Sequence, residues 1–464
     1  KLGVAREDKL IHDEGNHQRN FIMADYILCP NDYTRDVILD DYCARDHTKA
    51  KLIMQGYPRT SELLKAPDND PAPGKQVIAF MPTWREGNRQ DIQIRDLNVF
   101  FREMDSRLDD DQVMFVNLHH KIEADIDLSA FSRVRKFPEG VDVYDFLRNA
   151  DILITDYSSI MFDYAVTRRK IILYCPDLSI YSNDRGFYFS VDDLPFPKVT
   201  DTEQLAEELK RGKEYDDSLF MEKFCCYESP DNAKHLCDVW LSSDKSDTKI
   251  EQATGACARK VLLYSDSLSA GSVTDLLYDY YSVHDENDYH AYLSFKNKLV
   301  SENMSSAYPL IENRFIIGCK GSQLFTKEQK PVRSDYLSGG TSFRKMMSSL
   351  ESAYAVEQAR RYPCCDFALW LLCDTSNYDT VLGFSHFSGP KALLLHNAMT
   401  DASEEDAHLR DAVKYYCRHC DHIFALADTD IKRAKSLFGI HFKEIDVIAA
   451  GRDLDDAIGN IIRQ

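Results

Sequence analysis

Hydroxyl and carboxylate side chains follow an apolar segment in Asp151–Ala165, DILITDYSSIMFDYA. The first part predicts a strand and the last part a helix, so Ser158 and Ser159 fall at the helix amino terminus. Free backbone N–H groups and the helix dipole there favour a phosphate or carboxylate. Asp163 lies one turn further along and could reach a ribose hydroxyl. Asp156 and the serines are also common N-cap residues, and the residues alone leave both interpretations open.

Two further predicted strands end in groups that could bind phosphate. Thr83 and Arg85 follow the strand Val77–Met81. An arginine can hold a diphosphate through two parallel hydrogen bonds, which a lysine cannot do. His119 follows the strand Met114–Leu118 and could give a proton to a leaving phosphate. A pair of surface histidines is an equally good interpretation of that strand end.

A polar loop follows a fourth predicted strand, Ile171–Tyr174. In it, Arg185 and Gly186 could approach the same rim, since a glycine permits close contact with the backbone. A plain turn fits these residues as well. Because the carboxyl ends of parallel strands meet at one edge of a sheet, the four segments together predict one anion site on one rim.

The elements that must position this rim are short apolar segments alternating with helical patterns of about 10 to 15 residues. This alternation predicts an α/β fold with parallel sheets built from βαβ units. The expected strands are Tyr26–Cys29, Lys51–Met54, Val77–Met81, Met114–Leu118, Ile152–Thr155, Ile171–Tyr174, Val261–Tyr264, Phe315–Gly318, Phe367–Leu372, Thr380–Phe384, Ala392–Leu395, His422–Ala425 and Ile445–Ala449.

Two stretches predict boundaries between parts of the chain. Residues 65–75, KAPDNDPAPGK, hold three prolines and a glycine, and residues 241–258 are polar and lack periodicity. Four parts are therefore expected: residues 1–65, the compact unit 66–240, the linker 241–258, and a second α/β unit, 259–464.

Charge and hydropathy limit the function. The 464 residues carry a net charge of −20, so there is no overall basic field to attract nucleic acid or anionic lipid. No apolar run approaches the roughly 20 residues that cross a bilayer. The first residues, KLGVARED, have neither an initiator Met nor the apolar segment of a secretion signal. We therefore expect the chain to begin inside a longer polypeptide.

The 13 cysteines are scattered and odd in number, which favours reduced thiols and a cytoplasmic location. Cys417 and Cys420 have the spacing of half a zinc site, but the adjacent Cys364 and Cys365 do not supply a matching second pair. Buried or surface thiols are the favoured interpretation. No metal site is predicted and no cofactor is required, although Mg²⁺ could accompany a bound diphosphate.

Taken together, these motifs resemble the CDP-glycerol:polyglycerophosphate glycerophosphotransferase family, the teichoic-acid polymerases and primases of bacteria. The resemblance covers about residues 1–240. It rests on RNFIMADYILCPNDYTRDV (19–37), GYPR (56–59), AFMPTWR (79–85), the strand end at His119, DILITDYSSIMFDYA (151–165) and RGFYF (185–189).

This resemblance implies a GT-B fold, in which two Rossmann-like domains face each other across a cleft. It implies transfer of glycerol phosphate from CDP-glycerol to a polymer hydroxyl with release of CMP, a reaction that depends on positioning and charge stabilisation. His119 and Arg85 are the implied catalytic residues. The candidate residues for binding the diphosphate and ribose are Thr83, Arg85, His119, Asp156, Ser158, Ser159, Asp163, Arg185 and Gly186.

The chain departs from the family at two places. The family has a catalytic His in an HGTPxK motif, and the start of this chain resembles the residues just after it. We therefore expect the general base to be absent from this chain. His119 is followed by His120, where relatives often have Pro or Tyr, so either ring could face the ligand.

The second half resembles the N-terminal domain of a GT-B glycosyltransferase, through residues 259–277, 378–383, 391–397, 421–435 and 445–452. Two alternative functions stay open: a glycosyltransferase using a sugar nucleotide for wall or capsule polysaccharide, and a degenerate binding module. The family's lipid-linked acceptor implies peripheral contact with the inner face of the membrane. Whether the acceptor is polyglycerophosphate, ribitol phosphate or a capsular sugar is left open.

Overall fold

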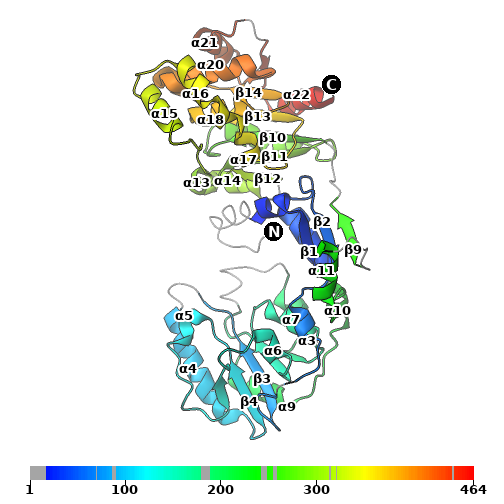
Figure 1. Cartoon of the computed structure of the whole chain (residues 1–464). Helices are drawn as coiled ribbons and strands as arrows, with labels where there is room; N and C mark the ends of the chain where they lie inside the picture. Colours follow the sequence, from blue (N-terminus) through cyan, green and yellow to red (C-terminus); the bar gives the residue numbers. More distant parts are fainter. Residues whose placement is uncertain are drawn as a thin grey trace.

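The computed structural model consists of a lower unit, a small middle sheet and an upper unit (Figure 1). Its three sheets have six, three and seven strands in the described residues. Those residues are 17–68, 70–85, 90–178, 189–241, 248–253, 259–312, 315–319, 321–441 and 444–463.

The lower unit is built on a parallel sheet with the strand order β5-β4-β3-β6-β7-β8. A first strand at the centre, with later strands added on both sides, is the Rossmann arrangement. The strands are β3 (Gln76–Met81), β4 (Gln112–Val116), β5 (Val134–Lys136), β6 (Ile152–Thr155), β7 (Lys170–Tyr174) and β8 (Lys198–Val199). The helices are α3 (Thr60–Leu63), α4 (Gln90–Arg107), α5 (His120–Glu123), α6 (Val143–Leu147), α7 (Ile160–Ala165), α9 (Thr202–Lys210) and α10 (Ser218–Phe224), with a 3-10 turn η3 (Val191–Asp193).

Alternate residues of these strands enter two separate cores, one on each face of the sheet. On β3, Val77 and Ala79 pack with α6, α7 and α10, whereas Ile78 and Phe80 pack with α4 and α9. Both faces are therefore covered by helices, which explains why the strands are apolar throughout. The expected strands of this unit are confirmed to within two residues at each end.

The middle sheet joins strands from distant parts of the chain. Strands β1 (Tyr26–Cys29) and β2 (Lys51–Met54) pair in parallel, and β9 (Lys249–Gln252) pairs antiparallel to β2. Strand β9 lies within the stretch expected to be a polar linker. Between β1 and β2 lie α2 (Asp32–Asp36) and the π-helical turn η1 (Val37–Asp41).

The chain passes between the middle sheet and the lower unit along two adjacent segments. The backbone N–H of Gly56 donates to Tyr227 at 3.0 Å, and the Gln55 amide donates to the carbonyl of Asn232 at 2.6 Å. Asn232 begins helix α11 (Asn232–Leu241). A Cβ at Gly56 would meet the side-chain ends of Glu228 and Asn232, which would have to shift to make room for it.

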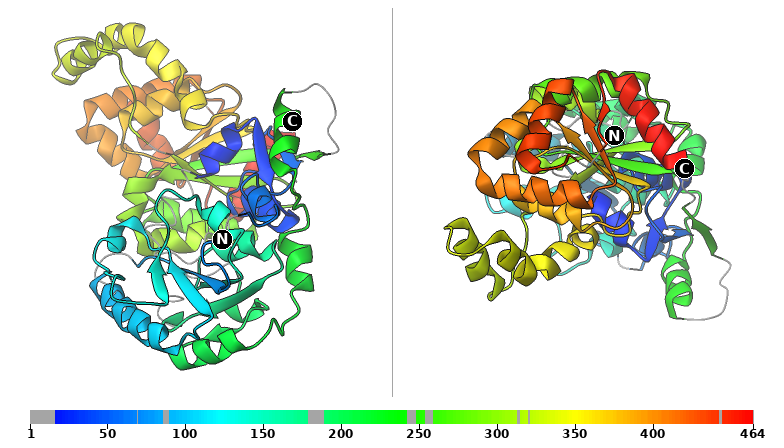
Figure 2. Two further views of the ribbon diagram at one scale, coloured as in Figure 1. Left: turned by 60° about the horizontal axis from the view of Figure 1, so that its bottom comes forward. Right: turned by 90° about the horizontal axis from the view of Figure 1, so that it is seen from above.

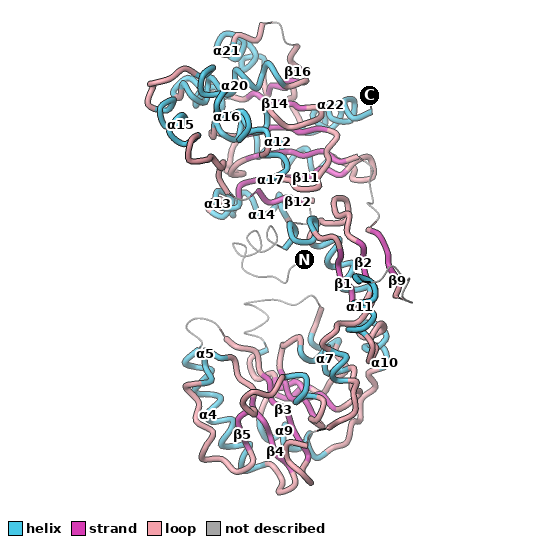
Figure 3. Tube along the Cα trace, in the orientation of Figure 1, coloured by secondary structure: helices cyan, strands magenta, loops and turns pink. Residues whose placement is uncertain are grey.

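The upper unit also has a parallel sheet, of order β12-β11-β10-β13-β14-β15-β16, with its first strand inside the sheet and later strands on both sides. Helices α12 and α22 pack on each other on one side of this sheet, and α18 and α20 on the other (Figures 2 and 3). The strands are β10 (Lys260–Ser265), β11 (His290–Lys296), β12 (Ile316–Cys319), β13 (Leu369–Asp374), β14 (Lys391–Leu395), β15 (His422–Ala425) and β16 (Asp446–Val447). The helices are α12 (Ser272–Val283), α13 (Asn297–Ser301), α14 (Met304–Ile311), α15 (Gln329–Leu337), α16 (Phe343–Ala355), α17 (Glu357–Arg361), α18 (Tyr378–Ser385), α19 (Asn397–Glu405), α20 (Ala407–His419), α21 (Asp428–Phe438) and α22 (Gly451–Arg463).

One expected strand of this unit is wrong: Thr380–Phe384 lies within helix α18. The Asn377 side chain caps this helix by accepting from the backbone N–H of Thr380 at 3.0 Å. Residues 379–385 are all buried, so the segment shows no polar face. A short, wholly buried helix and a buried strand give the same apolar pattern, and here the cap was the distinguishing signal.

The loop before β2 fastens the middle sheet to the upper unit. The Asp46 side chain is only 1% exposed; it pairs with His290 Nδ1 and accepts from the Tyr292 hydroxyl at 2.8 Å. Burial on its own would raise the pKa of Asp46, but these hydrogen bonds outweigh it and hold that pKa below its usual value. Beside it, the buried His47 ring packs on Tyr292 and Phe367.

We expect Asp46→Ala to destabilise this junction by about 3 kcal/mol, because His290 and Tyr292 lose a buried charged partner. The measurement is hydrogen exchange of the β10 and β11 amides, which reports local opening. Asp40→Ala is the control, since Asp40 makes only an exposed ion pair with Arg45 and should cost less than about 1 kcal/mol. Equal effects of the two variants would contradict this account.

Candidate functional site

Three strand ends of the lower unit bring the predicted residues to one edge. Strand β3 pairs in parallel with β4 on one side and β6 on the other. Thr83 and Arg85 follow β3, His119 follows β4, and Asp156, Ser158 and Ser159 follow β6. The parallel pairing thus places all three segments at the carboxyl edge of the sheet, at the switch point of its strand order.

The Asp156 carboxylate ties the loops after β3 and β6 together. It is 4% exposed. Its Oδ1 accepts from the Thr83 backbone N–H at 2.9 Å, from the Thr83 hydroxyl at 2.6 Å and from the Tyr157 N–H at 2.6 Å. Its Oδ2 accepts from Arg85 at 3.0 Å. Asp156 therefore acts in this structure as the anchor of the two loops.

The Arg85 guanidinium is held by two carboxylates. It donates to both oxygens of Asp177, at 2.9 and 3.1 Å, as well as to Asp156 and to the Thr83 carbonyl. Burial opposes the charge, but Asp177 and Asp156 outweigh it and raise the pKa of Arg85 above its usual value. The same pairing lowers the pKa of Asp177, although burial alone would raise it. The two groups are therefore both ionised at neutral pH.

His119 lies at the start of helix α5, and its ring contacts Lys121, Trp84 and His120. Its Nδ1 accepts from the backbone N–H of Lys121 at 3.3 Å, which caps the helix. Its ring stacks on Trp84, with centroids 4.9 Å apart and planes 14° apart, and His120 lies 4.2 Å away. Desolvation first, and then the charges of His120 and Lys121, lower the pKa of His119.

The two serines precede helix α7. Ser158 Oγ accepts from the backbone N–H of Ile160 at 3.4 Å. Ser159 is the N-cap residue by backbone position, and its side chain makes no capping hydrogen bond. Ser159 also lines a cavity, so its hydroxyl is placed at a surface that a ligand can reach.

That cavity has a volume of about 500 Å³ and is lined by residues that follow strand β1 of the middle sheet and by residues of the lower unit. At one wall, Asp163 receives two hydrogen bonds from Arg59, at 3.0 and 3.2 Å, and one from the Tyr144 hydroxyl at 2.7 Å. The Arg59 guanidinium also lies 4.0 Å from the centre of the Tyr57 ring. The lining residues are Pro30, Asn31, Tyr33, Thr34, Tyr57, Arg59, Tyr157, Ser159, Phe162, Asp163, Phe189, Phe224 and Glu228.

Sequence reasoning missed three polar members of this region: Arg59, Tyr144 and Asp177. Asp177 follows strand β7, so the strand-end rule that selected Arg85 would also have selected it. Arg59 belongs to the GYPR segment and carried a detectable signal. Tyr144 lies on helix α6, and its contact with Asp163 depends on tertiary packing alone. The predicted Arg185 and Gly186 lie outside the described residues.

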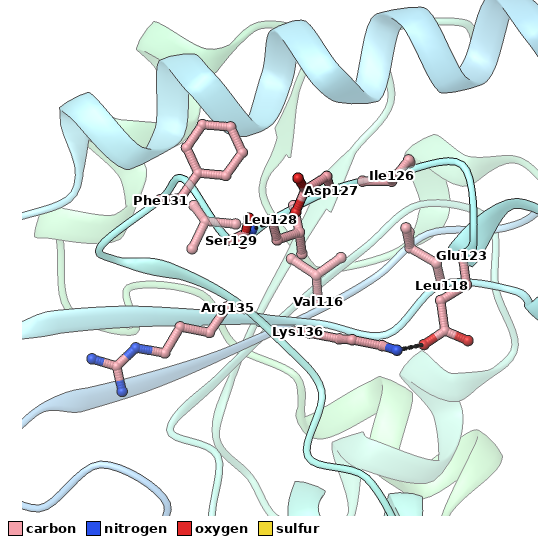
Figure 4. A pocket seen from close by; sticks show the side chains of 11 residues that line it. Val116, Leu118, Glu123, Ile126, Asp127, Leu128, Ser129, Phe131, Arg135 and Lys136 are labelled. Atoms are coloured by element: carbon pink, nitrogen blue, oxygen red, sulfur yellow. Dashed lines mark hydrogen bonds and ion pairs between the residues drawn. The ribbon is translucent and has the colours of Figure 1, made fainter.

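A second cavity, of about 400 Å³, lies at the outer edge of the sheet beside β4 and β5 (Figure 4). It is lined mainly by apolar side chains, with an ion pair of 3.0 Å between Lys136 and Glu123 at its rim. None of the predicted site residues lines it. In the part of the chain that the structure describes, no group of three His, Cys, Asp or Glu side chains has the arrangement of a metal site.

The fold and site define an α/β protein with Rossmann units and a cluster of cationic, carboxylate and hydroxyl side chains at one strand edge. A family model described as CDP-Glycerol:Poly(glycerophosphate) glycerophosphotransferase matches residues 1–241, more than half of the 464 residues. The chain belongs to this family, which confirms the resemblance that its motifs indicated.

Individual relatives agree with this assignment. The teichoic acid glycerol-phosphate transferase of Staphylococcus aureus is 31% identical over 237 residues, 46% of this chain and 60% of the relative. The teichoic acid poly(glycerol phosphate) polymerase of Bacillus spizizenii is 28% identical over 252 residues, 48% and 62% respectively. The chain thus spans about 60% of the length of these two relatives. A solved structure of the wall teichoic acid polymerase TagF is 28% identical and covers 48% of this chain and 59% of that one, with a TM-score of 0.40.

The pairing of Asp177 with Arg85 predicts a loss of stability in acid. A carboxylate with a depressed pKa in the folded state stabilises the protein above its unfolded pKa, near 4, and this contribution is lost as the pH falls through the folded value. We expect Asp177→Asn to lower the free energy of unfolding by about 1 kcal/mol at pH 7 and to flatten its decline below pH 5.

Urea unfolding of the lower unit at pH 3.5 to 7 measures this effect. Asp193→Asn, at an exposed site, is the matched control and should leave the pH profile unchanged. A profile of Asp177→Asn that is as steep as that of the wild type would refute the assignment.

Proposed function

We propose that the protein transfers glycerol phosphate from CDP-glycerol to a teichoic-acid-like or capsular polymer acceptor and releases CMP. The family description and the names of the two relatives support this reaction class. One of the solved structures of the TagF polymerase, 26% identical to this chain, was obtained after a soak with CDPG. These relatives extend beyond the region they share with this chain, so the activity of the whole protein is proposed here.

The observation that carries the proposal is the grouping at one sheet edge. Arg85, His119 and Ser159 come from three adjacent strand ends, and Ser159 opens onto a cavity of about 500 Å³. Cationic and hydroxyl donors of this kind suit a diphosphate. The aromatic and polar walls, with Arg59 and Asp163, suit a nucleoside.

In the proposed reaction, a hydroxyl oxygen of the acceptor forms a bond to the β-phosphorus of CDP-glycerol. The bond from that phosphorus to the bridging oxygen breaks, and its electron pair leaves with CMP. His119 donates a hydrogen bond from Nε2–H to the CMP phosphate, which stabilises the charge that develops there, while Arg85 and the loop at Ser158 stabilise the charge on the transferring group. The proton of the acceptor hydroxyl passes to a general base, and none of the described residues is assigned that role.

Binding of the nucleotide would use the cavity wall. Asp163 would accept from the ribose hydroxyls, and Arg59, released from Asp163, would face a phosphate. Thr83 and Asp156 keep the loop of Arg85 in place, and Arg185 and Gly186 remain candidate contacts on the same rim. A Mg²⁺ ion accompanying the diphosphate would be held by phosphate oxygens and would add positive charge.

We further propose a lipid-linked acceptor and a peripheral position on the inner face of the membrane, as the family's substrates suggest. Among the described helices, none has the length and apolar character to cross a bilayer. On the exposed surface of helix α4, Ile92 and Val99 are about half exposed and lie among both acidic and basic residues.

Calorimetry on the full-length protein tests the donor. We expect saturable binding of CDP-glycerol and of CDP, with competition between the two, because the diphosphate and base are shared. UDP-glucose is the comparison ligand. Binding of UDP-glucose with equal or greater affinity, or displacement of CDP-glycerol by it, would favour a sugar-nucleotide transferase and contradict the proposal.

Replacing the serines tests the phosphate site. We expect Ser158→Ala combined with Ser159→Ala to lower turnover of CDP-glycerol by about 10² to 10³-fold, because donors to the transferring phosphate are lost. The assay is release of CMP by the full-length protein. Ser106→Ala, on an exposed serine of helix α4 in the same unit, is the control and should keep wild-type turnover. Unchanged turnover in the double variant would contradict the role of the serines, whereas a wild-type protein that binds CDP-glycerol without turnover would support a degenerate binding module.

A further inference from the structure

Trp84 lies between two predicted site residues, Thr83 and Arg85, yet no catalytic chemistry requires an indole there. Its ring stacks almost parallel to the His119 ring, at 4.9 Å between centroids. The Lys121 ammonium also lies against the Trp84 ring, 4.1 Å from its centre. The indole nitrogen is buried and makes no hydrogen bond in the described residues. The side chain is therefore placed by ring contacts.

The backbone around Trp84 is fastened from two sides. Asp156 holds the N–H and hydroxyl of Thr83. Gln93, on helix α4, donates to the Thr83 carbonyl at 2.8 Å and accepts from the Arg85 backbone N–H at 2.9 Å. The turn that carries Trp84 is thus fixed both to the end of strand β6 and to helix α4. The indole therefore offers a rigid surface to the His119 ring.

The His119 ring, which stacks on Trp84, is also held at its Nδ1 atom. His119 Nδ1 accepts from the backbone N–H of Lys121, so the neutral imidazole carries its proton on Nε2. The hydrogen bond selects the nitrogen that bears the proton, and the stacking on Trp84 holds the ring in the plane in which this bond can form. Together they direct Nε2–H toward one side, which a hydrogen-bond donor to a leaving phosphate needs.

We propose that Trp84 is a positioning residue that holds His119 in the orientation and tautomer required to donate a hydrogen bond from Nε2–H to the departing CMP phosphate. This inference rests on the proposed function for the role of His119, but the ring geometry itself is independent of it. Trp84 would act on turnover rather than on affinity, because it touches His119 and not the donor nucleotide.

Steady-state kinetics of the full-length protein with CDP-glycerol test this role. We expect Trp84→Leu to lower kcat at least 10-fold and to change KM for CDP-glycerol less than about threefold, since only stabilisation of the leaving phosphate is impaired. Trp84→Phe keeps a flat ring and should retain kcat within about threefold. Trp240→Leu, at an exposed tryptophan on helix α11, is the matched control and should behave as the wild type.

A double-variant comparison separates this role from a merely structural one. If Trp84 acts through His119, Trp84→Leu should cause no further loss of kcat in a His119→Asn background. A loss of the same size in both backgrounds would overturn the inference, as would a Trp84→Leu enzyme with wild-type kcat.

Nitrogen NMR of histidine-labelled protein provides a readout without turnover. The His119 signal, assigned by its loss in His119→Asn, should show a proton on Nε2 in the wild type and in Trp84→Phe, and a mixture of tautomers in Trp84→Leu. An unchanged tautomer in Trp84→Leu would overturn the positioning role. If the wild type fails to turn over CDP-glycerol while the tautomer responds as expected, the proposed function fails and the positioning of His119 stands.

Discussion

The buried carboxylate of Asp156 is the interaction on which the candidate site depends. Three of its hydrogen bonds go to donors of Thr83 and Tyr157, and a fourth goes to Arg85. Because one side chain joins the loops after β3 and β6, the residues on these loops cannot move independently. A charged acceptor with four donors is well satisfied even when buried, so it can serve as a rigid anchor.

A second constraint is the way in which the middle sheet is attached to the lower and upper units. Between the middle sheet and the lower unit, the chain passes along two segments held by hydrogen bonds at Gln55 and Gly56. Towards the upper unit, by contrast, Asp46 and His47 are buried against the first residues of β10 and β11. The wall of the cavity that contains Arg59 therefore lies close to the first junction, and the upper unit is attached through a buried ion pair and ring contacts.

Much of this architecture could be predicted from the sequence, for reasons that particular elements make clear. Strands β2, β6 and β15 were placed at their observed bounds because each is a short apolar run between polar turns. Strand β11 was missed, although it is buried over most of its length. Strand β9 was missed because its residues are polar and largely exposed, so that only its pairing with β2 makes it a strand.

The residues of the candidate site could likewise be predicted only in part. Arg85, His119 and the serines could be found because a rule about parallel strands brings their sequence positions to one edge. The partners of these residues could not be found in this way. The contact of Arg59 with Asp163 spans 104 residues, and that of Trp84 with His119 depends on how two loops pack. Sequence patterns thus located the groups that could do chemistry, whereas packing decided which of them are paired.

The pairing of arginines with carboxylates at the candidate site shows one role of the protein's many acidic residues. Arg59 and Arg85 are held by Asp163 and by Asp156 with Asp177, so their charges are already balanced in this structure. A phosphate that takes donors from either arginine has to compete with a carboxylate, and the released carboxylate must find other donors. The hydroxyls of a ribose are such donors. A ligand carrying both a diphosphate and a ribose can therefore exchange partners at Arg59 and Asp163 without leaving either charge unpaired, whereas an isolated phosphate cannot.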